Sequence, residues 1–315
     1  MKGSNAMLNL SRNFVRLCGA ALVAAALTST TSAADITVKH AQGETVVTAN
    51  PEKIVVFDFA TLDNLNRLGV KIIGIPGNIP FPDYLKKYEG DDYTKVGTLF
   101  EPDYEAVNAV EPELIIVGGR SAAKYGELAK IAPTIDVTVA AKNFIADTEA
   151  NVEKLGQIFG KETEAKAEIE KLDAALAALK EKAVGKGKGL MILTSGGKMS
   201  AYGPGSRFGV IHDSFGVEPA APDLAIGSHG QPISSEFILE TNPDWLFVID
   251  RDAAIGREGN SAKQVLDNDL VRQTNAWKKD QIVYLNSQNW YLVGGGLGAL
   301  HGTIEQLSQA FEKAE

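Results

Sequence analysis

The stretch EAVNAVEPELIIVGGR, residues 105–120, carries the pattern that decides the fold. It aligns without a gap on EFILETNPDWLFVIDR, residues 236–251. In both copies a segment headed by a glutamate leads through a proline and an acidic residue into an apolar run, and an arginine follows that run. A helix, a proline turn and a buried strand also recur in unrelated α/β proteins, but Glu, Pro and Arg at matching positions indicate an internal repeat. The repeat predicts two α/β units.

Short apolar runs also alternate with helical patterns outside the repeat. In the first half, strands are expected at 54–57 and 72–75 around a helix at 62–68. In the second half, a strand at 190–194 and a glycine-rich loop precede a helix at 208–215. Such an order is typical of a mostly parallel sheet that is covered by helices on both faces.

Between the two units lies a segment made almost entirely of helix-forming residues. Residues 161–185 are therefore expected to form one long helix that joins an N-terminal α/β lobe, 35–160, to a C-terminal α/β lobe, 186–315. Its apolar residues recur at three- and four-residue steps: Ala165, Ile169, Leu172, Leu176 and Leu179. Because a single helix is stiffer than a loose loop, we expect lobes that move little.

Residues 1–34 are typical of a secretory signal peptide. Arg12 and Arg16 precede an apolar run at 17–27, and small residues follow at the expected cleavage positions. That run is too short to span a bilayer. The sequence therefore predicts export, with residues 1–6 read as a segment appended ahead of a natural start at Met7.

Cys18 leaves a second interpretation of this segment open. A cysteine near the N-terminus can accept a lipid anchor, but here an arginine stands among the residues before it and the apolar run follows it. We therefore favour a cleaved, unanchored protein. Cys18 is the only cysteine of the chain, so the sequence predicts no disulfide framework and no cysteine-based metal or iron–sulfur cofactor.

Composition excludes several classes of function. The 315 residues are 44% hydrophobic and 23% charged, which is ordinary for a soluble globular protein. The formal net charge is −9, and removal of residues 1–34 makes it −12 because three basic and no acidic residues are lost. This balance argues against a nucleic-acid partner. The usual hydrolase and nucleotide-binding motifs are absent, and we do not expect an enzyme.

Three arginines are candidates for a ligand site. Arg120 and Arg251 follow the two repeated strands, and Arg207 lies in the loop after the first strand of the second half. In open parallel sheets, ligands bind beyond the carboxyl ends of the strands, so two facing lobes create a cleft at those ends. Three guanidiniums there suit a compact, multiply charged anion. Any one of them alone also fits a surface or ion-paired residue.

A histidine and a tyrosine complete the candidate set. His229 is flanked by glycines, so no bulky neighbour would prevent it from approaching a ligand or metal. Tyr291 lies where a strand is expected to give way to a glycine-rich loop, 294–298. Taken singly, His229 also fits a loop residue and Tyr291 a half-buried aromatic.

These residues together resemble the periplasmic iron–siderophore binding proteins of ABC importers, in particular those for ferric catecholates in Gram-negative bacteria. The resemblance covers residues 36–315. It rests on the long helix and on several short segments: GSRFG at 205–209, SHG at 228–230, SEFILE at 235–240, VIDR at 248–251 and WYL at 290–292. It implies two Rossmann-like lobes with a ligand cleft between them.

The resemblance also implies a role for each candidate. Arg120, Arg207 and Arg251 match the arginines that balance the negative charge of a ferric catecholate, and His229 and Tyr291 match residues that ligate Fe(III) directly in some members. Glu105 and Glu236 resemble the glutamates that dock onto the permease dimer; acids at helix N-termini are also favoured by the helix dipole.

The expected protein is thus a monomeric, non-enzymatic periplasmic binding protein. It would hold no intrinsic cofactor, capture an Fe(III)–catecholate siderophore and deliver it to an inner-membrane ABC importer. Two alternatives stay open: binding of another iron chelate (hydroxamate or carboxylate) or a corrinoid, and a periplasmic enzyme or sensor on the same two-lobe scaffold.

Overall fold

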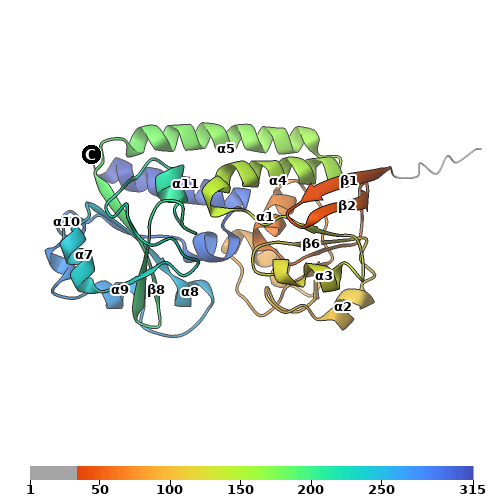
Figure 1. The fold of residues 1–315 in the computed structure, drawn as a ribbon, viewed down its shortest axis with the longest axis horizontal. Helices are drawn as coiled ribbons and strands as arrows, with labels where there is room; N and C mark the ends of the chain where they lie inside the picture. The colour runs from red at the N-terminus through yellow and green to blue at the C-terminus, as the bar shows by residue number, and fades with distance from the viewer. Residues whose placement is uncertain (1–33, 315) are drawn as a thin grey trace, which may run out of the picture. The chain divides into compact units, whose positions relative to one another are not determined.

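The computed structural model describes residues 34–314, which belong to one compact unit. It contains a five-stranded parallel sheet of order β5-β4-β3-β6-β7 and a six-stranded mixed sheet of order β11-β9-β8-β12-β13, in which β10 also pairs with β8. In the mixed sheet only β9 runs against its neighbours. The two α/β units predicted from the repeat are confirmed (Figure 1).

The first lobe contains the elements that precede the long helix. They are β1 (Asp35–His40), β2 (Gly43–Thr48), β3 (Ile54–Val56), α1 (Phe59–Arg67), β4 (Gly74–Ile75), η1 (Asp83–Glu89), β5 (Thr94–Lys95), α2 (Tyr104–Ala109), β6 (Leu114–Val117), η2 (Ala122–Lys124), α3 (Tyr125–Leu128), β7 (Thr134–Asp136), η3 (Ala141–Asn143) and α4 (Phe144–Ile158).

The long helix is α5 (Glu162–Ala183), and the second lobe follows it. Its elements are β8 (Lys188–Ser195), β9 (Lys198–Tyr202), α6 (Val210–Asp213), β10 (Glu218–Pro219), β11 (Gln231–Ile233), α7 (Ser235–Thr241), β12 (Trp245–Asp250), α8 (Arg251–Ala254), α9 (Ala262–Leu266), η4 (Val271–Gln273), α10 (Asn275–Lys278), β13 (Ile282–Tyr284), η5 (Asn289–Val293) and α11 (Leu297–Lys313).

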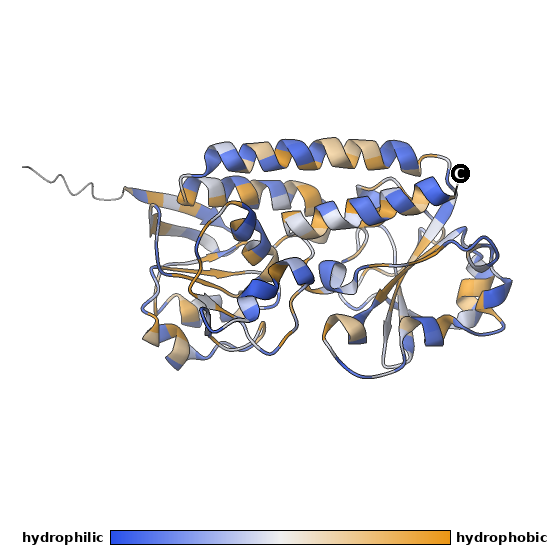
Figure 2. Cartoon of the chain, turned by 180° about the vertical axis from the view of Figure 1, so that it is seen from behind, coloured by the Kyte–Doolittle hydropathy of each residue, from blue (hydrophilic) through white to orange (hydrophobic). Residues whose placement is uncertain are grey.

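Apolar burial explains the central strands. Every residue of β3 and β6 is buried, as are the first five of β12, so these strands carry apolar side chains on both faces. Figure 2 shows the strands of both sheets as largely hydrophobic, whereas α5 alternates hydrophobic and hydrophilic residues. Of the stripe predicted for α5, Ala165, Leu172, Leu176 and Leu179 are buried and Ile169 is partly buried.

The C-terminal helix connects the two lobes. α11 packs against α5 and against α1 of the first lobe, and its first N–H groups donate to α1 side chains. The N–H of Leu297 donates to Asn64 Oδ1 (2.8 Å) and that of Ala299 to Asp63 Oδ2 (2.9 Å). One continuous hydrophobic cluster includes residues of both lobes, α5 and α11. Residues 34–314 therefore pack as a single unit. The division into segments 35–160, 161–185 and 186–315 stays a prediction.

Three local expectations differ from the structure. The segment expected to be a glycine-rich loop after the strand at 190–194 contains strand β9, so Arg207 follows β9 rather than the first strand of this lobe. The helix expected at 208–215 is reduced to α6, because Gly203–Gly209 folds back on itself: the N–H of Gly209 donates to Ser206 O and that of Ser206 to Gly203 O. The expected end of a strand at Tyr291 is instead a one-turn π-helix, η5. π-Helical turns occur often at functional sites.

No helix within residues 34–314 is long and apolar enough to cross a membrane.

Candidate functional site

A cavity of about 420 Å³ is lined by residues of both lobes. The first lobe contributes residues from the segments that follow β3, β6 and β7, and the second lobe contributes the loop before α6, the loop before β11 and η5. In parallel sheets the carboxyl ends of the strands share one edge, which explains why the first-lobe segments meet. The second-lobe loops instead follow the antiparallel strand β9 and precede β11. The lining includes Asp58, Arg120, Phe144, Arg207, Ile226 and Tyr291.

The three predicted arginines surround the ring of Tyr291. The distance from the ring centroid to the guanidinium carbon Cζ is 5.3 Å for Arg120, 4.6 Å for Arg207 and 5.5 Å for Arg251. Arg120 comes from the first lobe and the other two from the second. Within the described chain, Arg251 is not among the residues that line the cavity; it reaches the site through its contact with Tyr291.

Hydrogen bonds fix the cluster. Arg251 Nε donates to Tyr291 Oη (2.8 Å), and Arg251 Nη1 donates to Ser195 Oγ (3.2 Å). Arg207 Nη2 donates to the carbonyl oxygen of Tyr291 (3.1 Å), and Arg120 Nη2 donates to the same oxygen. One backbone carbonyl of η5 therefore holds an arginine from each lobe.

Charge in the cluster lowers the pKa of Tyr291. Burial alone raises the pKa of Tyr291, but the hydrogen bond from Arg251 and the positive charges of Arg251, Arg207 and Arg120 outweigh burial, so its pKa is lowered. Burial, together with the charge of Arg207, lowers the pKa of Arg120 as well. A guanidinium stays protonated in proteins despite such a shift.

Two carboxylates accompany the arginines. Asp252 Oδ1 lies 3.7 Å from Arg251 Nη1, and the Asp252 side chain is only 6% exposed. Asp58 lines the cavity and caps α1 by accepting hydrogen bonds from the N–H and hydroxyl of Thr61 (2.8 Å each). Burial raises the pKa of Asp58. Three guanidiniums against two carboxylates leave a positive site within a protein whose net charge is −9.

Part of the cavity lining, here called the apolar wall, consists of aliphatic and aromatic side chains. It includes Val139 and Phe144 from the first lobe and Ile226 from the loop before β11. Ile226 is 65% exposed, so its side chain is available to contact a ligand in the cavity. The cavity therefore combines a surface for an anion with a surface for an apolar or aromatic group.

His229 lies outside this arrangement. Its loop neighbours Gly227 and Ser228 line the cavity, whereas His229 is exposed and is not among the lining residues. Within residues 34–314 no group of three or more His, Cys, Asp or Glu side chains is placed to hold a metal ion. The role of His229 as an iron ligand stays a prediction.

The two glutamates occupy equivalent positions in the two lobes. Glu105 lies in the first turn of α2 and Glu236 in the first turn of α7, and both are exposed. α2 follows β5 and α7 follows β11, so each glutamate lies shortly after the carboxyl end of a strand at the edge of its sheet. A hydrogen bond with the Ser234 side chain lowers the pKa of Glu236.

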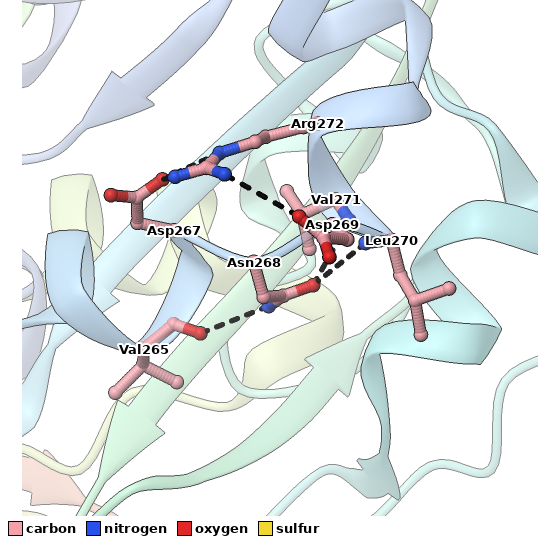
Figure 3. A network of polar contacts seen from close by, with 7 residues as sticks. All are labelled: Val265, Asp267, Asn268, Asp269, Leu270, Val271 and Arg272. Atoms are coloured by element: carbon pink, nitrogen blue, oxygen red, sulfur yellow. Dashed lines mark hydrogen bonds and ion pairs between the residues drawn. The ribbon is translucent and has the colours of Figure 1, made fainter.

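A polar network supports the start of α7. Asn268 Nδ2 donates to Ser235 Oγ (3.1 Å), while Asn268 Oδ1 accepts from the N–H groups of Leu270 and Val271 (3.1 Å each). Arg272 forms ion pairs with Asp267 and Asp269 in the same segment (Figure 3). This network lies beside a hollow of about 630 Å³ that Glu236 and Asn268 help to line.

Sequence reasoning missed Asp58, Ser195 and the apolar wall. Asp58 follows β3, so the strand-end argument that selected Arg120 applies to it equally. Ser195 ends β8 and is detectable by the same argument. Phe144 and Ile226 are in segments with no strand-end pattern, and no signal in the sequence separates them from other apolar residues.

Comparison with known proteins identifies the family that shares this fold. Residues 39–289 match the family model described as "Periplasmic binding protein". The chain is 44% identical over 290 residues to the petrobactin-binding protein YclQ of Bacillus subtilis, covering 90% of this chain and 91% of YclQ. Superposition on the crystal structure of YclQ gives a TM-score of 0.86 over 89% of this chain and 99% of that one.

Two further proteins extend the comparison. The ferric-anguibactin-binding protein FatB of Vibrio anguillarum is 31% identical and covers 88% of each chain. The structure of the periplasmic catecholate-siderophore binding protein VctP of Vibrio cholerae has a TM-score of 0.83 at 33% identity, covering 88% of this chain and 100% of that chain.

These matches confirm the two-lobe α/β fold predicted from the repeat. They also place the chain among proteins that bind rather than catalyse. The chain belongs to the periplasmic binding protein family, as a substrate-binding protein for Fe(III)–siderophore complexes of an ABC importer.

Proposed function

We propose that the protein captures a ferric catecholate siderophore, either a bis-catecholate or a tris-catecholate, in the cavity between its lobes. The observation that carries this proposal is the convergence of Arg120, Arg207 and Arg251 on Tyr291. Catecholate oxygens are anionic, and guanidinium donors form strong charge-assisted hydrogen bonds to them. The apolar wall formed by Phe144 and Ile226 suits the catechol rings.

The similar proteins support this ligand class. YclQ is named for petrobactin, and VctP is described as a catecholate-siderophore binding protein. A hydroxamate or carboxylate chelate or a corrinoid would also place anionic groups near the arginines, but it would use the apolar wall less. These ligands are therefore the competing outcomes of the binding test.

The test is a titration of the mature protein with ferric bis-catecholate, ferric tris-catecholate, ferric citrate, a ferric hydroxamate and cobalamin. Trp290 lines the cavity, so its fluorescence reports occupancy. We expect saturable quenching with both catecholates at concentrations about 100-fold lower than with the other probes. Tighter binding of citrate, hydroxamate or cobalamin would contradict the proposed ligand class.

We further propose that Tyr291 and His229 complete the coordination of iron in a tetradentate bis-catecholate. Such a ligand leaves two of the six Fe(III) positions open, and Fe(III) prefers anionic oxygen donors. The lowered pKa of Tyr291 favours its phenolate form, while His229 would have to move inward with the loop that carries Gly227 and Ser228.

Direct ligation of iron by Tyr291 and His229 predicts different losses of binding affinity for the two ligand types. Tyr291→Phe and His229→Ala should each weaken binding of the bis-catecholate about tenfold or more, since each removes an iron donor. The tris-catecholate already fills all six positions, so its affinity should change less than about threefold. Isothermal titration of both ligands measures this, and Tyr284→Phe, a tyrosine of β13 outside the cavity lining, is the matched control. Equal losses for both ligands would exclude direct ligation.

Delivery is proposed to use Glu105 and Glu236. Both glutamates are exposed in the first turns of helices that follow an edge strand, one in each lobe. A pair of carboxylates at equivalent positions suits a permease dimer that presents basic side chains from both halves. The protein itself is proposed to act as a monomer.

Localisation is proposed to be the periplasm, after export directed by residues 1–34. Residues 1–33, including Cys18, lie outside the described part of the chain. The related proteins come from Bacillus as well as Vibrio, so they do not support the Gram-negative origin expected from the resemblance. Intact mass and N-terminal sequencing of the protein from its host should give a start near Asp35; a lipid-modified Cys18 would contradict an unanchored protein.

A further inference from the structure

A short loop before α2 displays two aromatic side chains beside Glu105. Phe100 is 52% exposed and Tyr104 is 37% exposed. Among residues 34–314 only six large hydrophobic side chains are this exposed, and these two lie within five positions of Glu105. Exposed aromatic residues clustered with a charged group are typical of a protein–protein contact.

The loop is held rigidly. Gly97 and Pro102 pair as an isolated bridge, and Thr98 Oγ1 accepts hydrogen bonds from the N–H groups of Phe100 (3.2 Å) and Glu101 (3.0 Å). Gly97 has a φ of +110°, and a Cβ there would collide with the backbone of Glu101. A preformed loop loses little entropy when a partner covers it.

The loop lies at the same edge of the first-lobe sheet as Arg120, although its residues are not among those that line the cavity. It follows β5, while Arg120 follows β6 in the same parallel sheet, so both are at the carboxyl edge. Lys124 of η2, in the segment that begins at Arg120, forms a 2.7 Å ion pair with Glu101. In Figure 1, α2 lies on the side of the first lobe away from α5. A partner that receives ligand from the cavity would reach this loop.

The acids around the aromatic side chains define the chemistry of the partner. Asp103 caps α2 through Ala106 N–H (3.0 Å), and Glu101 is paired with Lys124. Glu105 is exposed in the first turn of α2. Aromatic faces beside a carboxylate suit a guanidinium, which stacks on the ring and pairs with the acid.

We propose that Phe100 and Tyr104, together with Glu105, form a docking surface for an arginine-bearing loop of the permease. This inference rests on the proposed transport function. It assigns the aromatic contact to the first lobe alone. In the second lobe, Glu236 lies instead beside a hollow lined by residues such as Lys198, Ile233 and Asp269. The two lobes therefore offer the permease different surfaces.

The test replaces both aromatic residues by serine in cells that carry the cognate permease and lack the wild-type gene. Uptake of a ⁵⁵Fe-labelled bis-catecholate at subsaturating concentration should fall about tenfold or more, because aromatic residues at the centre of an interface contribute most of its affinity. Binding of the same complex by the purified variant should stay within twofold of wild type. The matched control is Val46→Ser with Val184→Ser, two side chains that are 56% and 75% exposed elsewhere.

The outcomes separate this proposal from the transport function. If the wild-type protein binds the complex but supports no uptake, the proposed function is wrong and the docking surface with it. If wild type and the Phe100→Ser/Tyr104→Ser variant support equal uptake, the transport function stands and the docking surface is wrong. A photo-crosslinker at position 104 should yield the permease subunit by mass spectrometry. Aromatic-dependent binding to anionic lipid vesicles without permease would show that a membrane is the partner and overturn the proposal.

Discussion

Replacing Arg207 by alanine is expected to weaken binding of both bis-catecholate and tris-catecholate complexes by about 100-fold. The Arg207 guanidinium lies 4.6 Å from the Tyr291 ring centroid and is part of the cavity lining. Within the described chain one of its N–H groups is committed, to the Tyr291 carbonyl, so others can reach a ligand. Loss of charge-assisted hydrogen bonds to an anion costs about 1.5–3 kcal/mol, and the upper value corresponds to roughly 100-fold.

The matched control for this variant is Arg272→Ala. Like Arg207, Arg272 lies over an aromatic ring, that of Trp277, but it is outside the cavity and is held by ion pairs with Asp267 and Asp269. Affinity measured by fluorescence titration should be unchanged in the control. Arg207→Lys should recover about a tenth of wild-type affinity, because it keeps the charge but loses the planar fork. A loss below threefold in Arg207→Ala would mean that the ligand does not contact this side of the cavity.

The stability of the fold is expected to depend on pH through Asp63. This carboxylate is fully buried in α1 and accepts hydrogen bonds from Ala299 N–H (2.9 Å) and Tyr84 Oη (3.2 Å). Burial raises its pKa to about 6, although the hydrogen bonds from Ala299 and Tyr84 and the charge of Arg67 partly oppose this. Gly298 permits the close approach, since a Cβ there would lie 2.6 Å from Asp63 Oδ1.

The sign of the effect follows from proton binding. Between about pH 4 and pH 6 the folded protein keeps the Asp63 proton while the unfolded chain has lost it, so the free energy of unfolding falls as the pH rises. A shift of about two pH units corresponds to about 3 kcal/mol. Below pH 4 and above pH 6 this group should contribute no further slope.

Asp63→Asn isolates the contribution of Asp63 to the pH dependence of the unfolding free energy, because asparagine does not titrate. Urea unfolding of both proteins at pH 4.5 and pH 7.5 measures it. We expect the unfolding free energy of wild type minus that of the variant to decrease by about 2 kcal/mol over this range. A difference that stays constant or increases with pH would show that the carboxylate is ionised and well accommodated in the folded state.

The sequence by itself determined the two-lobe architecture. Residues 105–120 and 236–251 form two inner strands, β6 and β12, and the helices that precede them. An apolar run next to a helical pattern is compatible with few arrangements other than a buried strand packed against a helix. The periodicity of residues 161–185 likewise predicted α5 to within two residues at each end. Arg120 and Arg251 were predictable because the carboxyl ends of strands in parallel sheets face the ligand site. Arg207 was selected as a residue that follows the first strand of the second half, whereas it follows the antiparallel strand β9.

Only the tertiary structure decided which of these side chains meet. Tyr291 receives arginines from both lobes because η5 lies at their junction, and the one-turn π-helix has no distinct sequence signal. The crossover of α11 onto Asp63 and Asn64 joins residues more than 230 positions apart, and local patterns contain no information on such pairs. The exposure of Phe100 and Tyr104 is decided in the same way, because an aromatic residue in the sequence is equally compatible with a core or a surface position until the fold places its neighbours.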